Sequence, residues 1–174
     1  VPMNADGTFR QINICGKTLS GKAYLDEVDR LVRIACLPCR DREEYQVALD
    51  YMWYWWAGPD SPSFDKHQMA NFERYLLSDK EPHKEIQGPY YKLRTDSDIC
   101  DRILDEFGVV GEHRHIINGH VPVKTIKGES PVRADGKVLV IDGGFSRPYH
   151  DETGIAGYTL VFNSHGMQLV QHEP

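Results

Sequence analysis

The first part of the chain carries apolar residues at helical spacing. From Ala23 onward they recur at intervals of three or four, which predicts an amphipathic helix that Pro38 ends. The apolar face of this helix consists of Leu25, Val28, Leu31, Val32 and Ala35. Before it, the segment Thr8 to Ile14 alternates apolar and polar residues and runs into the turn Cys15-Gly16-Lys17, which predicts a small hairpin.

A second helix is expected from Glu43 to Trp56. Its apolar stripe consists of Val47, Tyr51, Tyr54 and Trp55. Because aromatic side chains remove large areas from water when they are buried, we expect the three tryptophans of this helix to belong to the core rather than to a cofactor site. These tryptophans are Trp53, Trp55 and Trp56.

Two more helices complete the helical part of the chain. One is expected from Lys66 to Leu77. The other is expected from Asp96 to Phe107, with Thr95 or Asp96 as its N-cap and Gly108 at its end.

After Gly111 the pattern changes to short apolar runs that are separated by glycine-rich turns. The expected strands are His115–Asn118, Val138–Ile141, Tyr158–Phe162 and Met167–Val170. Two dipeptides, Asp135-Gly136 and His165-Gly166, are expected to form hairpin turns.

This order of elements predicts an α/β chain of the α+β kind, with a helical first half followed by a mostly antiparallel sheet. We expect a hairpin in residues 1–20, a mainly helical part in 21–110 and a β-rich part in 111–174. At 174 residues the chain suits one domain or part of a larger one. Because it begins at Val1 and not at a methionine, we expect 1–174 to be a single partial domain cut from a longer protein.

The composition argues against several classes of protein. Apolar residues make up 40% of the chain, enough for a core, and no apolar run approaches the roughly 20 residues of a membrane-spanning helix. The 20 basic and 26 acidic residues give a net charge of −6, unlike a nucleic-acid-binding protein. No signal peptide is expected. The pair in Cys36-Leu37-Pro38-Cys39 has no second pair to complete a zinc site, so we expect reduced thiols and a cytoplasmic protein.

Two expected strands run directly into glycine turns that carry polar side chains. Ile116 to Asn118 leads to Gly119 and His120, and Val138 to Ile141 leads to Asp142. Rigid strand ends are where open sheets place ligand-binding side chains. The pattern therefore predicts a site and leaves its chemistry open.

Histidines accumulate around the first of these strand ends. His113, His115 and His120 form an H-x-H-x4-H pattern, and neutral imidazole is a common ligand of transition metals. His113 and His115 either share a strand face or are polar surface residues, whereas His120 is the favoured ligand because its neighbours fix the backbone. Its partner ligands must lie elsewhere. Asp142 either directs a carboxylate into the site or caps its own turn.

Basic side chains and tyrosines alternate between residues 66 and 94. Arg and Lys match phosphate groups and tyrosine rings pack on sugar faces, so the segment suits an anionic ligand rich in hydroxyl groups. Acidic residues are interspersed, and a solvated helical face explains the same pattern. The residues are Lys66, Arg74, Lys80, Lys84, Lys92 and Arg94, with Tyr75, Tyr90 and Tyr91.

Six segments carry a resemblance that covers nearly the whole chain. The longest are Ile116–Lys124, Val140–Ser146 and Thr153–Leu160. The others are Phe72–Tyr75, Asp79–Glu85 and Pro89–Tyr91. Together they resemble the bacterial class III fructose-1,6-bisphosphatases.

The resemblance implies a calcineurin-like metallophosphatase, an α/β fold built on a central β-sandwich with flanking helices. It also implies two divalent metal ions, typically Mn²⁺, held by motifs of the types GDxHG, GDxxDRG and GNHD, none of which occurs here. The family's Asn-Gly-His motif maps onto His120, the one metal ligand this chain is expected to carry. The chain thus resembles a C-terminal-middle portion of the enzyme, and we expect it to be inactive alone.

The activity implied by the resemblance is hydrolysis of fructose 1,6-bisphosphate to fructose 6-phosphate and phosphate in gluconeogenesis. The expected partners are a sugar bisphosphate and further copies in a homo-oligomer, without nucleic acid or membrane. We expect the substrate to be bound by Lys124, Arg74, Arg94 and Tyr91. Two alternatives stay open: a related metallophosphatase for another phosphoester, and a non-catalytic module for sugar-phosphate binding or assembly.

A few positions depart from the family pattern. Ser63 and Asp65 stand where members tend to carry Leu and Gly, and Arg147-Pro148 stands where Lys-Ala is more usual. Asp65 adds negative charge beside Lys66, which argues against Lys66 as an anion-binding residue.

Overall fold

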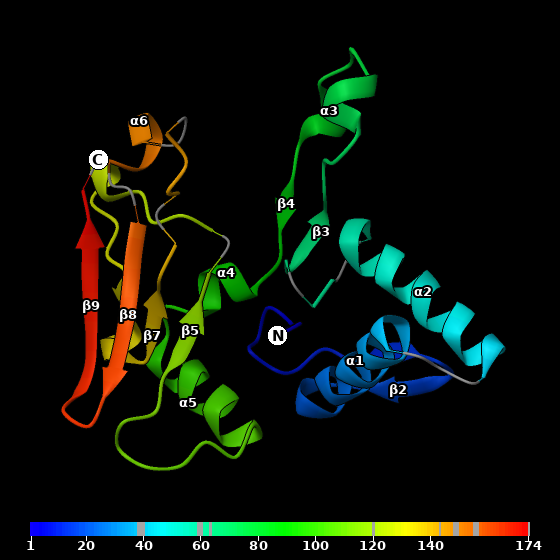
Figure 1. The fold of residues 1–174 in the computed structure, drawn as a ribbon, viewed down its shortest axis with the longest axis horizontal. Coiled ribbons are helices and arrows are strands. Elements are labelled where there is room, and N and C mark those ends of the chain that lie inside the picture. The colour runs from blue at the N-terminus through cyan, green and yellow to red at the C-terminus, as the bar shows by residue number, and fades with distance from the viewer. Residues whose placement is uncertain are drawn as a thin grey trace. The chain divides into compact units, whose positions relative to one another are not determined.

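The computed structural model describes residues 1–37, 41–58, 61–62, 64–119, 121–142, 144–147, 150–154 and 157–173 (Figure 1). Contacts divide the chain into two compact units, Val1–Leu93 and Arg94–Pro174, which we call unit 1 and unit 2. Each unit has its own cluster of buried apolar side chains. In the parts of the chain that are described, no helix is long and apolar enough to cross a membrane.

Unit 1 begins with the hairpin expected from the sequence. Strands β1 (Ile12–Ile14) and β2 (Lys17–Leu19) pair antiparallel, and both residues of the turn between them have positive φ. The helix α1 (Gly21–Cys36) follows and packs against α2 (Arg42–Ala57), so both long helices predicted here are confirmed. The core of unit 1 consists of Ile14, Tyr24, Leu31, Ala48 and Trp55.

The buried face of α2 differs from the predicted stripe. Trp55 and Tyr51 contribute to the core as expected, but Tyr54 is 45% exposed and Val47 lies at the surface. The expectation that all three tryptophans are core residues is wrong for Trp53 and Trp56, which are 65% and 46% exposed. The helix is apolar around most of its circumference, so residue spacing alone could not select the face that packs against α1.

The segment from Lys66 to Leu77 is not one helix, contrary to the prediction. It begins as β3 (Lys66–Gln68), which pairs antiparallel with β4 (Ile86–Gln87), and only its end is helical, as α3 (Glu73–Leu76). Asp65 has a left-handed backbone conformation with a φ of 44°, which separates the strand from what precedes it. Pairing with a distant segment thus overrides the local pattern. The remaining elements of unit 1 are η1 (Glu81–His83) and α4 (Tyr90–Leu93).

Helix α5 (Ser97–Glu106) in unit 2 confirms the fourth predicted helix. The side chain of Asp96 caps it by accepting hydrogen bonds from the main-chain nitrogens of Asp98 and Ile99, at 2.9 and 3.3 Å. Such a cap satisfies main-chain donors that have no partner inside the helix, which is why the sequence revealed it. Gly108 follows the helix at a φ of 68°, as a helix-ending glycine should.

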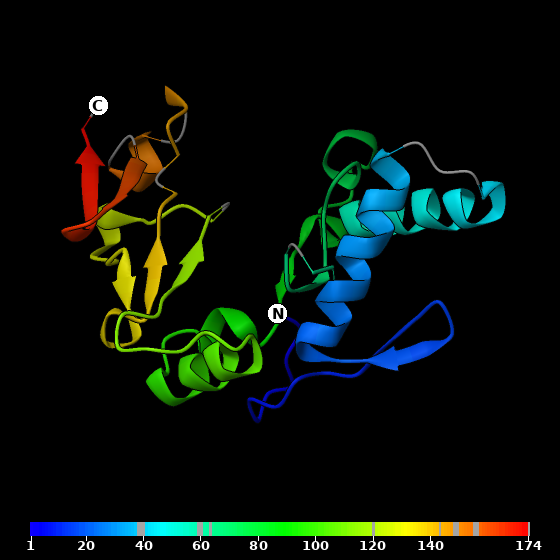
Figure 2. The ribbon, with the colours of Figure 1, turned by 60° about the horizontal axis from the view of Figure 1, so that its bottom comes forward.

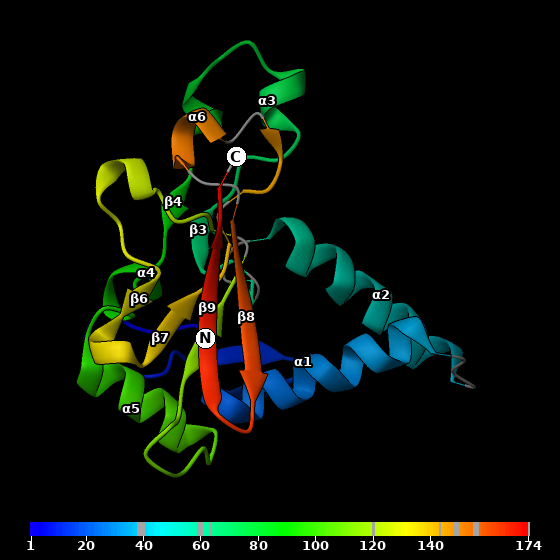
Figure 3. The ribbon, with the colours of Figure 1, turned by 60° about the vertical axis from the view of Figure 1, so that its left-hand side comes forward.

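After α5, the chain of unit 2 forms a three-stranded sheet with the strand order β5, β7, β6 (Figure 2). Strand β5 (Ile116–Asn118) runs parallel to β7 (Val138–Val140), and β6 (Val132–Arg133) runs antiparallel to β7. A separate hairpin consists of β8 (Gly157–Asn163) and β9 (Gly166–His172) (Figure 3). The short helical elements are η2 (Thr125–Lys127), η3 (Ala134–Gly136) and α6 (His150–Thr153). The core consists of Cys100, Val123, Ala134, Val138, Val140 and Tyr158.

The elements confirm a mixed α/β chain with early helices and small, mostly antiparallel sheets. All four strands expected after Gly111 form, and Asp135-Gly136 lies between the antiparallel strands β6 and β7 as a hairpin connection. Strands β3, β4 and β6 were not expected. The described residues form one three-stranded and three two-stranded sheets, and they show no β-sandwich of the kind the resemblance implied.

Candidate functional site

The carboxyl ends of β5 and β7 lie at the same edge of the sheet in unit 2. Asn118 is opposite Val140 in the parallel register, and the main-chain nitrogen of Ile141 donates to the carbonyl of Asn118 at 2.9 Å. The two segments therefore leave the sheet side by side, at Gly119 and at Asp142. Both strand ends were predicted, and the parallel pairing is what places them together.

The segment after β5 is anchored on the segment after β7. The main-chain nitrogen of Val123 donates to the carbonyl of Asp142 at 2.8 Å, and the Val123 side chain is fully buried. Burying a valine side chain stabilises a fold by about 1.5–3 kcal/mol relative to leaving it exposed. The loop that carries the Asn-Gly-His motif is thus fixed at both ends, by the strand and by Val123.

Asp142 uses part of its carboxylate to shape its own turn. Oδ1 accepts a hydrogen bond from the main-chain nitrogen of Gly144 at 2.9 Å, which confirms the turn-capping interpretation for this oxygen. The other oxygen has no hydrogen bond to any residue that the structure describes. The capping role and a role in a site are therefore compatible, because one carboxylate offers about four acceptor positions.

The first two histidines of the H-x-H-x4-H pattern lie before the strand, not on it. Strand β5 starts at Ile116, after His113 and His115, and the Nδ1 atom of His115 lies 2.8 Å from the carbonyl oxygen of Gly136. His115 thus ties the start of β5 to the turn before β7, a structural role. His120 lies outside the described residues.

The described residues do not fit a metal centre by themselves. No group of three or more His, Cys, Asp or Glu side chains with the geometry of a metal site occurs among them. Asp142 offers an oxygen ligand that suits Mn²⁺, but a single carboxylate cannot hold a pair of ions. Other positions singled out from the sequence also lie outside the described residues, namely Pro38, Cys39, Ser63, Gly143 and Pro148.

Lys124 follows the anchored loop and begins η2. Its Nζ atom lies 3.7 Å from a carboxylate oxygen of Glu152 in α6, and its main-chain nitrogen donates to Glu129 at 3.2 Å. The Lys124 and Glu152 side chains are 38% and 67% exposed, and such a pair contributes only about 0–1 kcal/mol. Lys124 can therefore exchange Glu152 for an anionic ligand at little cost.

A short hydrogen bond holds α6 against η2. The Thr125 hydroxyl donates to the carbonyl of Thr153 at 2.6 Å, and Thr153 is buried. Gly154 follows at a φ of 79°, and a Cβ atom at this position would lie 3.1 Å from the Thr125 hydroxyl oxygen. The chain at Thr153 and Gly154 is thus tightly packed against η2.

The other expected substrate-binding residue of unit 2, Arg94, is buried and only 6% exposed. Its carbonyl accepts a hydrogen bond from the buried Sγ atom of Cys100 at 3.6 Å. The main chain of Arg94 is thus tied to α5, and its buried side chain offers little surface to a ligand.

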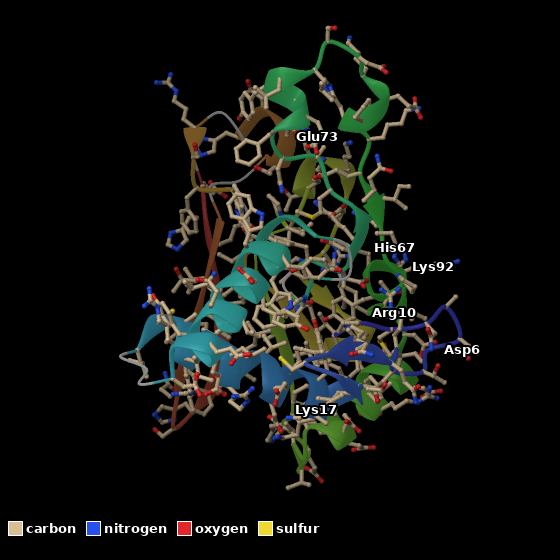
Figure 4. The ribbon with its side chains drawn as sticks, turned by 90° about the vertical axis from the view of Figure 1, so that its right-hand side faces the viewer. Asp6, Arg10, Lys17, His67, Glu73 and Lys92 are labelled. Carbon is tan, nitrogen blue, oxygen red and sulfur yellow. The ribbon has the colours of Figure 1, made fainter. Side chains whose placement is uncertain are left out.

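Tyr91 lines a pocket of about 700 Å³ in unit 1. His67 and Lys92 line the same pocket and lie near each other in Figure 4. The remaining lining residues are Ala5, Gln87, Gly88, Pro89 and Leu93. His67 and Lys92 are side chains that can donate hydrogen bonds to an anionic ligand, and the Tyr91 ring offers a face to a sugar.

Arg74 lines a second pocket of unit 1, of about 430 Å³. Aromatic side chains form much of its wall, and Arg74 makes no hydrogen bond or ion pair with any described residue. The other lining residues are Trp56, Ala70, Asn71, Phe72, Tyr75 and Glu85. Arg74 and Tyr91 thus belong to different pockets, and the two pockets share no lining residue.

Some basic residues between 66 and 94 are part of ordinary ion pairs. Lys66 pairs with Glu85 at 2.8 Å, and Lys84 pairs with Glu81 at 2.6 Å on an exposed surface. The solvated-face interpretation is therefore right for Lys84. Four lining residues were not expected as site residues, namely Trp56, His67, Asn71 and Glu85. Trp56 was assigned to the core, and the β3–β4 pairing that joins the segments of the other three was not predicted.

Comparison with known proteins identifies the family of the chain. The model of the Firmicute fructose-1,6-bisphosphatase family matches residues 1–174. A class 3 fructose-1,6-bisphosphatase from Bacteroides fragilis is 64% identical over 174 residues, which is all of this chain and 26% of the relative. Relatives of the same description from Phocaeicola vulgatus and Clostridium botulinum are 61% and 51% identical over the same share of both chains. No solved structure matches the chain.

The chain spans about a quarter of the length of these curated relatives. The similarity nevertheless extends over every residue of the chain, including the anchored loop after β5, the turn after β7 and both pockets of unit 1. The chain belongs to the Firmicute fructose-1,6-bisphosphatase family.

Proposed function

We propose that the protein to which this chain contributes hydrolyses fructose 1,6-bisphosphate to fructose 6-phosphate and phosphate. The observation that carries this proposal is the match of the family model over residues 1–174. The joint exit of β5 and β7 at one sheet edge supports it, because this is where such a sheet can present ligands.

The reaction is proposed to depend on divalent metal ions, with Mn²⁺ as the favoured ion and His120 as a ligand. His120 directly follows Gly119 in the sequence, and the chain reaches Gly119 at the sheet edge that also carries Asp142. The described residues supply no complete metal site, and we assign the remaining ligands to parts of the enzyme outside this chain.

Substrate phosphates are proposed to meet Lys124, which is partly exposed and only weakly paired. Arg74 and Tyr91 are proposed to contribute from the two pockets of unit 1, since each is an accessible side chain with a chemistry that suits a sugar phosphate. Arg94 is the weakest of the four candidates because it is buried.

A chimeric enzyme tests the proposed activity. Residues of the Bacteroides fragilis relative that match this chain are replaced by residues 1–174, and phosphate release is measured with Mn²⁺ on fructose 1,6-bisphosphate, glucose 6-phosphate, a nucleotide and a phosphopeptide. We expect fructose 1,6-bisphosphate to be the preferred substrate. Preference for a different phosphoester would support a related phosphatase, and a folded chimera that acts on none of them would support a non-catalytic module.

A further inference from the structure

The pocket around Arg74 has aromatic walls that remain open to solvent. Trp56, Phe72 and Tyr75 line it and are 46%, 48% and 86% exposed. The rings of Trp56 and Phe72 meet edge to face, with centroids 5.3 Å apart and an interplanar angle of 72°. Its volume of about 430 Å³ falls within the range of about 300–1,000 Å³ that is typical of small-molecule pockets.

Polar side chains in the same pocket have hydrogen-bonding capacity to spare. The Arg74 guanidinium and the side-chain amide of Asn71 make no hydrogen bond with any described residue. The main-chain nitrogen of Asn71 donates to Glu73 at 2.8 Å, which fixes the loop that carries this amide. Glu73 lies at the start of α3 (Figure 4).

Glu85 is held at the pocket as an ionised acceptor. One carboxylate oxygen accepts from Lys66 at 2.8 Å and the other from the main-chain nitrogen of Ala70 at 3.4 Å. Burial opposes ionisation, but these hydrogen bonds keep the pKa of Glu85 below its ordinary value. A carboxylate with two bonds retains acceptor positions for a ligand.

Donors and acceptors beside aromatic faces match a sugar ring better than a phosphate group. A hydroxyl group both donates and accepts, so it can bond to Arg74, Asn71 and Glu85, while phosphate at neutral pH needs donors and is repelled by Glu85. The C–H face of a sugar is apolar and can pack against Trp56 or Phe72. A cationic ligand is disfavoured by Arg74.

We propose that this pocket binds a sugar ring, with the C–H face of the ring on the aromatic wall and its hydroxyl groups on Asn71, Arg74 and Glu85. The choice of fructose as the sugar rests on the proposed function. The preference for a sugar ring over inorganic phosphate rests only on the side chains that line the pocket.

Saturation-transfer NMR on the purified protein tests this assignment. D-fructose and fructose 6-phosphate are each added to the protein, and inorganic phosphate is then titrated as a competitor. We expect saturation of the C–H protons of both sugars, weak binding in the millimolar range, and no displacement by inorganic phosphate. Because D-fructose carries no phosphate, this result is independent of any phosphatase activity.

Substitutions locate the binding in the pocket. Trp56→Ala and Asn71→Ala are expected to abolish the fructose signal, and Arg74→Gln to raise the Kd roughly tenfold, the effect of one charge-assisted hydrogen bond. Tyr45→Ala is the control, because Tyr45 is an exposed aromatic residue of the same helix α2 (37% exposed) that does not line the pocket. Circular dichroism verifies that each variant is folded. If Trp56→Ala does not fold, Asn71→Ala still tests whether the fructose signal comes from this pocket.

Three outcomes would overturn the assignment. The first is no saturation with either sugar, and the second is displacement of fructose 6-phosphate by inorganic phosphate without any signal from D-fructose. The third is a sugar signal that Tyr45→Ala reduces as much as Trp56→Ala, which would place the binding outside this pocket. Failure of fructose 1,6-bisphosphate hydrolysis in the chimera, with D-fructose still bound, would reject the proposed function and leave the sugar pocket intact.

Discussion

Asp65 and Gly88 form a close main-chain and side-chain contact where β3 and β4 meet α4. The main-chain nitrogen of Gly88 donates to the carbonyl of Asp65 at 2.6 Å, and that of Tyr90 donates to the Asp65 carboxylate at 2.8 Å. Burial raises the pKa of Asp65 above its ordinary value. The carboxylate of Asp65 is thus occupied in holding the segment before α4.

This contact predicts the effect of an added methyl group at Gly88. Its Cβ atom would lie 2.5 Å from the Cγ atom of Asp65, which is buried and hydrogen-bonded and cannot move aside. We expect Gly88→Ala to lower the free energy of unfolding by about 1–3 kcal/mol, measured by urea denaturation. In an Asp65→Gly background the same substitution should cost far less, because the obstructing side chain is gone and glycine suits the φ of 44°. Equal losses in the two backgrounds would argue against the contact.

His120 can be tested by metal content as well as by activity. In the chimera, His120→Ala is expected to reduce the number of Mn²⁺ ions bound per polypeptide, measured by elemental analysis after dialysis, because one imidazole ligand is lost. His165→Ala, in the exposed turn between β8 and β9, is the control. Full metal content in folded His120→Ala protein would remove His120 from the ligand set.

At the scale of elements, Glu27 connects three parts of unit 1. Its carboxylate accepts from Lys17 of β2 at 3.3 Å and from Arg30 of α1 at 2.9 Å, and Arg30 also pairs with Glu44 of α2 at 2.5 Å. Lys17 lies on the hairpin strand beside α1 (Figure 4). Glu27 is only 8% exposed, so this network is better shielded than an ordinary surface ion pair.

The network predicts a pH-dependent stability of unit 1. The hydrogen bond from Arg30 lowers the pKa of Glu27 against the opposing effect of burial. A carboxyl group with a lowered pKa in the folded state stabilises the fold above its ordinary pKa of about 4.3, and this contribution is lost as the pH falls through the lowered value. Glu27→Gln should therefore cost about 1–3 kcal/mol near pH 7 and progressively less in acid.

Chemical denaturation at several pH values checks this prediction. Asp29→Asn is the control, since Asp29 pairs with Arg33 at 2.7 Å on the same helix while both side chains are more than half exposed. It should change the stability little at any pH. A loss for Glu27→Gln that does not depend on pH would contradict the ionic account.

The elements that could be predicted are those whose signal is local. The periodicity of α1, the Asp96 cap of α5 and the short apolar runs of β8 and β9 all act within a few residues of chain. The pairing of β3 with β4 depends on residues far apart in the sequence, and the strands are too short to carry a pattern. The buried face of α2 was missed for a different reason, because nearly all of its faces are apolar.

The candidate site could be predicted only in part, because it too depends on the pairing of segments that are far apart in the sequence. The glycine turns after β5 and β7 are visible in the sequence, but only their parallel pairing shows that they leave one edge together. Arg74 and Tyr91 could be selected by residue type, whereas their pockets arise from the β3–β4 pairing and from residues such as Trp56 that looked like core.

At the scale of the whole molecule, the chain consists of two compact units. The curated relatives that it matches are about four times as long. The described residues contain no group of His, Cys, Asp and Glu side chains that could form a metal centre. The chain alone is therefore expected to release no phosphate from fructose 1,6-bisphosphate, even with Mn²⁺ present.

The most direct test of the account is the product formed by the chimera from fructose 1,6-bisphosphate and Mn²⁺. We predict fructose 6-phosphate and inorganic phosphate in equal amounts, at a rate close to that of the Bacteroides fragilis relative, while residues 1–174 alone form neither. A folded chimera that forms no fructose 6-phosphate would contradict it, as would turnover by the isolated chain at the same rate.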